Sequence, residues 1–437
     1  MLRAVIEHPD DVPRRLVYAD HLQQHGDPQG ELIAIQCRLA ADPHGPDHFA
    51  LEDRSKGLIA EHGAAWAARL GEQVTKVTYK LGLAASAVTP ITIGALDILD
   101  RAPIRDLGFS DDTDDDHTDV ARAFAQDPRL ARVELMATRI DWGEAGFTAL
   151  TRSPYLRTLR ALTISDHDAK VYAGVAIEHA RLPALEVLSI CGDYAGELGD
   201  VGVAALARAH LPALRDLGLF NVSCTHQAME ELAASVTITE LRGLELGWGS
   251  YTPNQIGPRG AFAIANSHNF EHIKRLGLDF NYIADAGLAS LARSPHLGAL
   301  RSLSLRANDI TDASLDELAT NTGMPHLELL ELSSNSAITA GGIAVLAASP
   351  RMATLTSLWL RQIALGPDAA IAIARAPHAA ALRSLNLLAC AIGDDGARAL
   401  LEAPHLAGLV ELQLSGNQIS ASLGAAIKAR WPAAVVR

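Results

Sequence analysis

The sequence repeats itself, because a short run of leucines followed by an asparagine returns about every 28 residues. The clearest copy is LRSLSLRANDI, from Leu300 to Ile310. Leu303 and Leu305 alternate, so both point to one face of a short strand. Asn308 follows where the strand ends, and its amide can bond free backbone groups of the turn. One such unit cannot bury its own apolar face, so the copies must stack against each other.

The copies extend over most of the chain. Residues equivalent to Leu303 are mostly 27 to 29 apart, two intervals are 26, and the interval from Leu244 to Leu276 is 32. A weaker copy within residues 74–79 is expected to lead the array. The equivalent positions are Leu107, Val133, Leu162, Leu188, Leu217, Leu244, Leu276, Leu303, Leu330, Leu358, Leu385 and Leu412.

This spacing resembles the leucine-rich-repeat pattern L-x-x-L-x-L-x-x-N-x-I. The second half of each unit predicts a helix. In DAGLASLARSP, Asp285 is expected to cap the helix and Pro295 to stop it, with Asp312, Thr339 and Asp394 as similar caps. A full helix in units of about 28 residues resembles the ribonuclease-inhibitor class. Helices are wider than the strand spacing of about 4.8 Å, so the stack must curve with its strands inside.

The fold class predicted is therefore α/β. We expect a curved leucine-rich-repeat solenoid with parallel strands on the concave face and helices on the convex face, preceded by a small all-α domain. The predicted boundaries are residues 1–72 for the helical domain and 73–437 for the solenoid, whose last residues, Ala425 to Arg437, form a cap.

The helical segment resembles the bacterial repeat-companion domain, a module that precedes leucine-rich repeats. The resemblance implies a bacterial origin and this architecture, and it implies no chemistry. One departure is His21, where the family usually carries Trp. The matching residues are Pro13, Leu16, Val17, Tyr18, Ala19, Asp20, Leu22, His25, Gly26, Asp27, Pro28, Glu31, Gln36 and Trp66.

The net charge and the cysteine content limit which partners the protein can bind and in which cell compartment it is expected. The formal net charge is −14, which disfavours a nucleic-acid backbone or an anionic membrane as partner. The four cysteines are far apart and form no C-x-x-C pair, and the N-terminus lacks an apolar signal core. We therefore expect a cytoplasmic protein that binds neither nucleic acid nor membrane and is monomeric when alone.

No enzyme motif is present, so we expect a non-enzymatic protein without cofactor or metal. The recurrent histidines of the repeats are better explained as a structural position. Two metal alternatives remain weaker. The acidic run Asp111 to His117 lacks the spaced ligands of a calcium loop, and Cys191 with Cys224 could approach a metal beside His167 or His226.

The informative surface is the concave face, to which the residues between the leucines point. Large aromatic residues there, bordered by charges of both signs, have the composition of a binding hot spot. Trp359 lies between Leu358 and Leu360, so its outward direction is the best determined. The predicted residues that bind an unidentified partner protein are Phe220, Glu245, Trp248, Tyr251, Asp279, Phe280, Arg306, Glu331, Trp359 and Arg361.

Two other functions stay open. The repeats resemble those of GTPase-activating proteins, which would act through polar residues such as Asn281, Asn308 or Arg306 at a strand edge. A structural protein that self-assembles through its convex helices or its acidic surface is the second. An interaction scaffold that binds through the concave face is the function the sequence favours.

Overall fold

The computed structural model describes residues 1–71, 73–110, 115–165, 170–192, 198–247, 253–321, 323–376 and 378–436. The chain divides into two compact units, which we describe separately. Unit 1 comprises Met1–Asp168 and His179–Glu186, and unit 2 comprises Ala169–Glu178 and Val187–Arg437.

Unit 1 begins with helices and an antiparallel hairpin, and continues as strands paired in parallel in the order β2-β3-β4-β5. Its elements are α1 (Leu2–Glu7), α2 (Val12–Gln24), α3 (Gln29–Ala41), α4 (His48–Ala68), β1 (Thr75–Lys80), β2 (Leu83–Pro90), η1 (Ala95–Asp100), β3 (Asp106–Ser110), α5 (Thr118–Ala125), η2 (Pro128–Arg132), β4 (Leu135–Arg139), α6 (Gly143–Thr151), η3 (Leu156–Thr158) and β5 (Ala161–Ser165).

The helices α2 and α3 are tied to the β1–β2 hairpin by buried polar groups. The Arg15 guanidinium donates to the carbonyls of Pro9 at 2.7 Å and of Leu81 at 3.0 Å. The Gly82 N–H donates to Gln36 Oε1 at 2.8 Å. Gly82 has φ +78°, and a Cβ there would overlap the backbone of Ile33. Hairpin and helices therefore fold as one body, whereas the domain boundary at residue 72 stays a prediction.

The register of unit 1 corrects two sequence predictions. Met136, not Val133, pairs with Leu107 on β3, so Val133 occupies the earlier buried position of its unit. The copy that leads the array is Ala87 on β2, which also pairs with Leu107, while residues 75–80 form the antiparallel strand. Both errors arise because any apolar residue at a strand spacing satisfies the leucine pattern.

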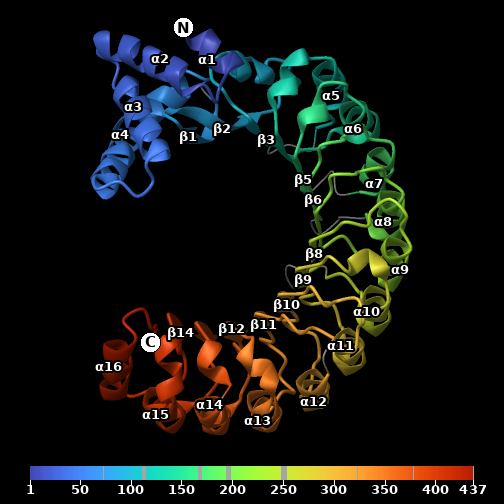
Figure 1. The fold of residues 1–437 in the computed structure, drawn as a ribbon. Coiled ribbons are helices and arrows are strands. Elements are labelled where there is room, and N and C mark those ends of the chain that lie inside the picture. Colours follow the sequence, from blue (N-terminus) through green and yellow to red (C-terminus); the bar gives the residue numbers. More distant parts are fainter. Residues whose placement is uncertain are drawn as a thin grey trace. The chain divides into compact units, whose positions relative to one another are not determined.

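Unit 2 alternates short strands and helices, and Figure 1 shows its strands on the inner side of a curve and its helices on the outer side. Strands β6 to β14 follow in chain order, and the pairs from β6 to β14 are parallel. Its strands are β6 (Val187–Cys191), β7 (Asp216–Phe220), β8 (Gly243–Glu245), β9 (Arg275–Gly277), β10 (Ser302–Ser304), β11 (Leu329–Glu331), β12 (Ser357–Trp359), β13 (Ser384–Asn386) and β14 (Glu411–Gln413).

The helices of unit 2 pack against one another on the outer side. They are α7 (Val171–Glu178), α8 (Gly199–Ala207), α9 (His226–Ala233), α10 (Gly257–Ala265), α11 (Ala284–Ala292), α12 (Asp312–Thr320), α13 (Ala340–Ala348), α14 (Gly366–Arg375), α15 (Gly393–Glu402) and α16 (Ala421–Arg430), with 3-10 turns η5 (His268–Phe270), η6 (Pro350–Ala353), η7 (Ala379–Ala381) and η8 (Pro404–Gly408). After α16, the Val435 backbone bonds to β14, so the predicted cap closes the last strand.

In unit 2 the leucines equivalent to Leu303 point into the layer between the strands and the helices. All of them, from Leu188 to Leu412, are buried. After β8, β9, β10, β11 and β14, a buried asparagine links its unit to the previous one. Asn308 Oδ1 accepts from the backbone N–H groups of Asn281 and Ile283, and its Nδ2 donates to two carbonyls. The asparagine row consists of Asn254, Asn281, Asn308, Asn335 and Asn417, and the equivalent positions after β12 and β13 are Ile363 and Cys390.

Three of the predicted helix caps have a different role. Asp285, Asp312 and Asp394 lie in the first turn of their helices, one or two residues after the cap. Each carboxylate accepts from the capping residue of the next helix. Asp285 accepts from the Thr311 N–H at 2.8 Å and from its hydroxyl at 2.6 Å. Thr339 does cap its helix, as predicted.

Candidate functional site

The inner surface of unit 2 is built from three rows of side chains, defined by their distance from the strand leucine. One row precedes the leucine, the second follows it by one residue and the third by three. Strand pairing aligns these rows, since Glu331 pairs with both Ser304 and Trp359 across β10, β11 and β12. We call these the inner-face rows.

Trp359 lies in the second inner-face row, between the buried Leu358 and Leu360, and its side chain is partly exposed. The Arg361 guanidinium lies over its ring, with Cζ 5.6 Å from the ring centroid. The indole N–H donates to Ser384 Oγ at 3.3 Å. Ring and guanidinium therefore form one flat, preorganised surface of the type that recurs at binding hot spots.

Glu331 is in the predicted row, but it is only 2% exposed, which excludes it as a direct contact residue. One carboxylate oxygen accepts from the Ser333 N–H at 2.7 Å, and the other pairs with Arg361 Nη2 at 2.9 Å. Glu331 therefore fixes the position of Arg361 and neutralises its charge.

The burial of Glu331 is explained by a backbone contact between neighbouring units. At two positions of the third inner-face row a side-chain oxygen accepts from the backbone N–H of the next unit, Asp279 from Arg306 at 2.9 Å and Ser333 from Arg361 at 2.8 Å. An arginine has no acceptor. After Arg306, the Ser333 N–H therefore bonds to Glu331, and after Arg361 the Leu388 N–H bonds to Asn386 at 3.1 Å.

Phe280 and Arg306 form a second aromatic–guanidinium pair. Phe280 follows β9 with φ 57°, and Arg306 Cζ lies 5.3 Å from its ring centroid. Arg306 Nη2 reaches Gln362 Oε1 at 3.5 Å, and no described carboxylate pairs with it. Asp279 also accepts from the Ser304 hydroxyl at 2.5 Å. All three predicted residues are partly exposed on the inner side.

Glu245 and Phe220 occupy the inner face over β7–β9. The Glu245 carboxylate lies against Gly277, where a Cβ would overlap it, and the Phe220 ring lies over Gly218 of its own strand. Burial raises the pKa of Glu245 to about 7, and nearby carboxylates add to the shift while Arg275 opposes it. Glycines in the neighbouring strand positions thus allow both large side chains to lie flat.

Some predicted residues lie outside the described residues. These are Trp248 and Tyr251, Asp111 to Asp114 of the acidic run, and His167. Within the described part of the chain no group of three or more His, Cys, Asp or Glu side chains could hold a metal. Asp116, from the end of the acidic run, accepts from the Thr118 N–H at the start of α5. Cys224 is buried and unpaired.

The structure also reduces the number of residues that could act in the alternative function, GTPase activation. Asn281 and Asn308 are fully buried members of the asparagine row. Neither amide can reach a second protein, so of the three residues considered only Arg306 remains available.

Sequence reasoning missed several residues of the inner face. Asp216 forms an ion pair with Arg275 across β8, and Gln362 receives bonds from Arg306 and from the Ser334 hydroxyl. The available signal was their position: Asp216 and Arg275 precede the strand leucine, which places them in the first inner-face row.

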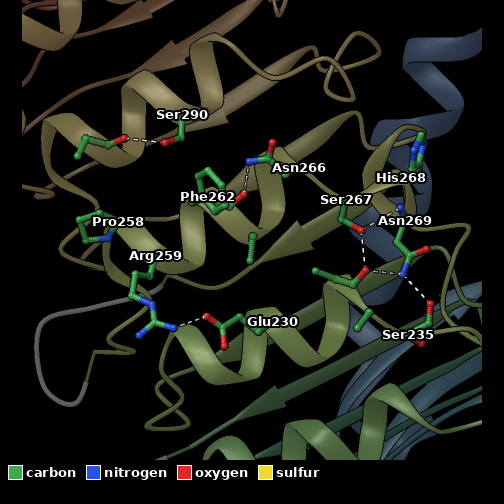
Figure 2. Close-up of a pocket in the computed structure, with 14 residues that line it drawn as sticks. Glu230, Ser235, Pro258, Arg259, Phe262, Asn266, Ser267, His268, Asn269 and Ser290 are labelled. Carbon is green, nitrogen blue, oxygen red and sulfur yellow. Dashed lines mark hydrogen bonds and ion pairs between the residues drawn. The ribbon is translucent and has the colours of Figure 1, made fainter.

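A groove of about 900 Å³ lies on the outer side of unit 2, between α9, α10 and α11 (Figure 2). Phe262, 59% exposed, lies in it, and the Arg259–Glu230 ion pair of 2.8 Å lies at one edge. The Ser267 hydroxyl donates to the carbonyl of Ala233 at the end of α9, and the Asn269 amide donates to the carbonyl of Ser235 just after it. The groove therefore offers mainly apolar surface.

In a comparison with known protein families, the model described as "Leucine Rich repeat" matches residues 379–401. The fold is that of a leucine-rich-repeat solenoid. No match was found among curated proteins. Solved structures that are similar include an internalin from Listeria monocytogenes, with 18% identity, 74% of this chain and 85% of that chain covered and a TM-score of 0.41.

A second similar structure is the complex of Rad7 and Elc1 in yeast. The matched chain has 15% identity to this one, 93% of each chain is covered and the TM-score is 0.45. In the ranges that the structure describes, no helix is both long and apolar enough to cross a membrane.

Proposed function

We propose that this protein is a non-enzymatic scaffold that binds a partner protein through the inner face of unit 2. The observation that carries the proposal is the pair of aromatic–guanidinium surfaces, Trp359 with Arg361 and Phe280 with Arg306. Both stand on rigid strand ends, so little side-chain freedom is lost on binding. Leucine-rich-repeat neighbours that include a complex with a second protein are consistent with this role.

The test compares two exposed aromatic residues on opposite sides of unit 2. The full-length protein, Trp359→Ala and Phe262→Ala are each used to capture proteins from the native cell, and captured proteins are identified by mass spectrometry. We expect Trp359→Ala, alone or with Trp248→Ala, to lose a partner that Phe262→Ala retains. Retention of every partner by Trp359→Ala with Trp248→Ala would contradict the proposal.

The groove of Figure 2 favours self-assembly as the second candidate function, because exposed Phe262 in an apolar groove can accept a helix of another copy. Sedimentation across a concentration range decides it. A monomer at all concentrations removes this candidate and agrees with the monomeric state predicted from the sequence. Phe262→Ser should abolish any association that the groove mediates.

We further propose a bacterial, cytoplasmic protein with ribonuclease-inhibitor-like repeats and a repeat-companion-like module in residues 1–72. The support for a reducing compartment is that Cys37, Cys224 and Cys390 are buried as free thiols. The −14 net charge supports a protein partner rather than nucleic acid or membrane.

A further inference from the structure

The middle of the inner face of unit 2, over β7–β12, is divided into a half with excess negative charge and a half with excess positive charge, and this division describes the partner. Over β7–β9 the inner-face rows hold three carboxylates, Asp216, Glu245 and Asp279, against one guanidinium, Arg275. The residues left undescribed there, 248–252, carry no charged side chain. This half of the face is therefore acidic.

Over β10–β12 the same rows hold two guanidiniums, Arg306 and Arg361, against one carboxylate, Glu331. Glu331 is committed to Arg361 at 2.9 Å and to the Ser333 N–H. Arg306 has no carboxylate within ion-pair distance among the described residues. This half is basic, and its uncompensated cation lies over the Phe280 ring.

In the acidic half it is a carboxylate that lacks a partner of opposite charge. Arg275 pairs with Asp216, and the Asp279 carboxylate is bonded by the Ser304 hydroxyl and the Arg306 N–H. Glu245 has no ion-pair partner among the described residues and faces Asp216, Arg275 and Asp279. A cation from outside would be attracted to Glu245, just as an anion would be attracted to Arg306.

We infer that the partner protein docks an extended segment that carries a basic side chain over Glu245 and an acidic side chain over Arg306. This inference rests on the proposed function, since it names the partner's chemistry at the same face. Glu245 and Arg306 are two strands apart, about 10 Å at the usual strand spacing. An extended segment covers that distance in about three residues, so the two charges stand three or four positions apart.

The probe is a phage library of random 12-residue peptides selected on the full-length protein. The expected consensus has Lys or Arg and Asp or Glu three or four positions apart, in either chain direction. For a selected peptide, Arg306→Glu should weaken binding at least about tenfold, and replacing the peptide's acidic residue by Lys should restore it. Arg259→Glu, on the outer helices, is the matched control and should change nothing.

A second variant tests the charge of the basic half without removing a cation. Glu331→Gln keeps an oxygen for the Ser333 N–H but leaves Arg361 uncompensated. We expect it to tighten binding of the same peptide about threefold, and more at low salt. Weaker or unchanged binding at low salt would count against the inference.

The outcomes separate the inference from the proposed function. Peptides that lose binding with Trp359→Ala but ignore Arg306→Glu, or lack the charge pair, overturn the inference and support the proposed function. Peptides that bind Trp359→Ala and Arg306→Glu as tightly as the unmodified protein overturn both. A selection that enriches no peptide also overturns both. Rescue of Arg306→Glu by the Lys peptide establishes the contact.

Discussion

Asn308 of the asparagine row and Arg306 of the third inner-face row lie only two residues apart, yet the fold places them in opposite environments. Asn308 in the asparagine row is fully buried, and four hydrogen bonds link its amide to two units. Arg306 is partly exposed, and among the described residues its guanidinium bonds only to Gln362. We therefore expect the asparagine row to determine stability and the inner-face rows to determine partner choice.

The largest expected effect breaks the asparagine row. Asn308→Ala removes the partner of two buried N–H groups and of the Leu278 carbonyl, whereas the Arg306 carbonyl keeps its bond from the Phe280 N–H. We therefore expect a loss of about 2 to 4 kcal/mol in the free energy of unfolding. Urea denaturation followed by circular dichroism measures it. Asn386→Ala is the matched control, because its amide accepts a single bond from the Leu388 N–H. Equal losses in the two variants would contradict the comparison.

A smaller effect concerns Glu245, an inner-face residue whose charged form is destabilised by burial in the folded protein. The pKa of Glu245 is raised from 4.5 to about 7, so the folded state favours the protonated carboxyl. The free energy of unfolding therefore falls as pH rises from the pKa of the unfolded state, 4.5, through the folded-state pKa of about 7. Glu245→Gln should therefore stabilise the protein by about 1 to 2 kcal/mol at pH 8 and leave it unchanged near pH 4. Thermal unfolding at the two pH values measures this.

The control for Glu245 is Glu411→Gln, since Glu411 is an exposed carboxylate on β14 that accepts from the Ser384 hydroxyl. A gain for Glu245→Gln that is the same at both pH values would show that packing against Gly277, rather than charge, limits stability there.

Asp285 tests the link between neighbouring helices. Burial opposes its ionisation, but hydrogen bonds from Thr311 and Ser314 outweigh burial, so its pKa is lowered from 3.8. This contribution is complete above pH 3.8 and is lost as pH falls through the lower folded-state pKa. We expect Asp285→Asn to cost about 1 kcal/mol at pH 7 and less at pH 3. Exposed Asp309→Asn is the control for the loss of one carboxylate and should cost less stability at pH 7 than Asp285→Asn.

The sequence predicted the repeat, the strand–helix alternation and the asparagine contacts, because these depend on spacing that every unit shares. It misplaced Val133, since one apolar residue replaces another without changing the pattern. It could not predict the burial of Glu331, which depends on Arg306 in the preceding unit lacking an acceptor. The asparagine after the long interval, Asn254, rejoins the row five positions later than the pattern places it.

The smallest expected effect on stability belongs to Trp359, and it separates the two rows most directly. The ring is partly exposed, donates one bond of 3.3 Å to Ser384 and carries Arg361 on its face. An exposed cation–π contact contributes about 0.5 to 1 kcal/mol, so Trp359→Ala should cost at most about 1 kcal/mol. Its neighbour Leu358, 1% exposed, should cost about 2 to 4 kcal/mol as Leu358→Ala. If Trp359→Ala destabilised as much as Leu358→Ala, the tryptophan would belong to the core of the scaffold, and loss of partner binding in that variant would no longer identify the inner face as the binding surface.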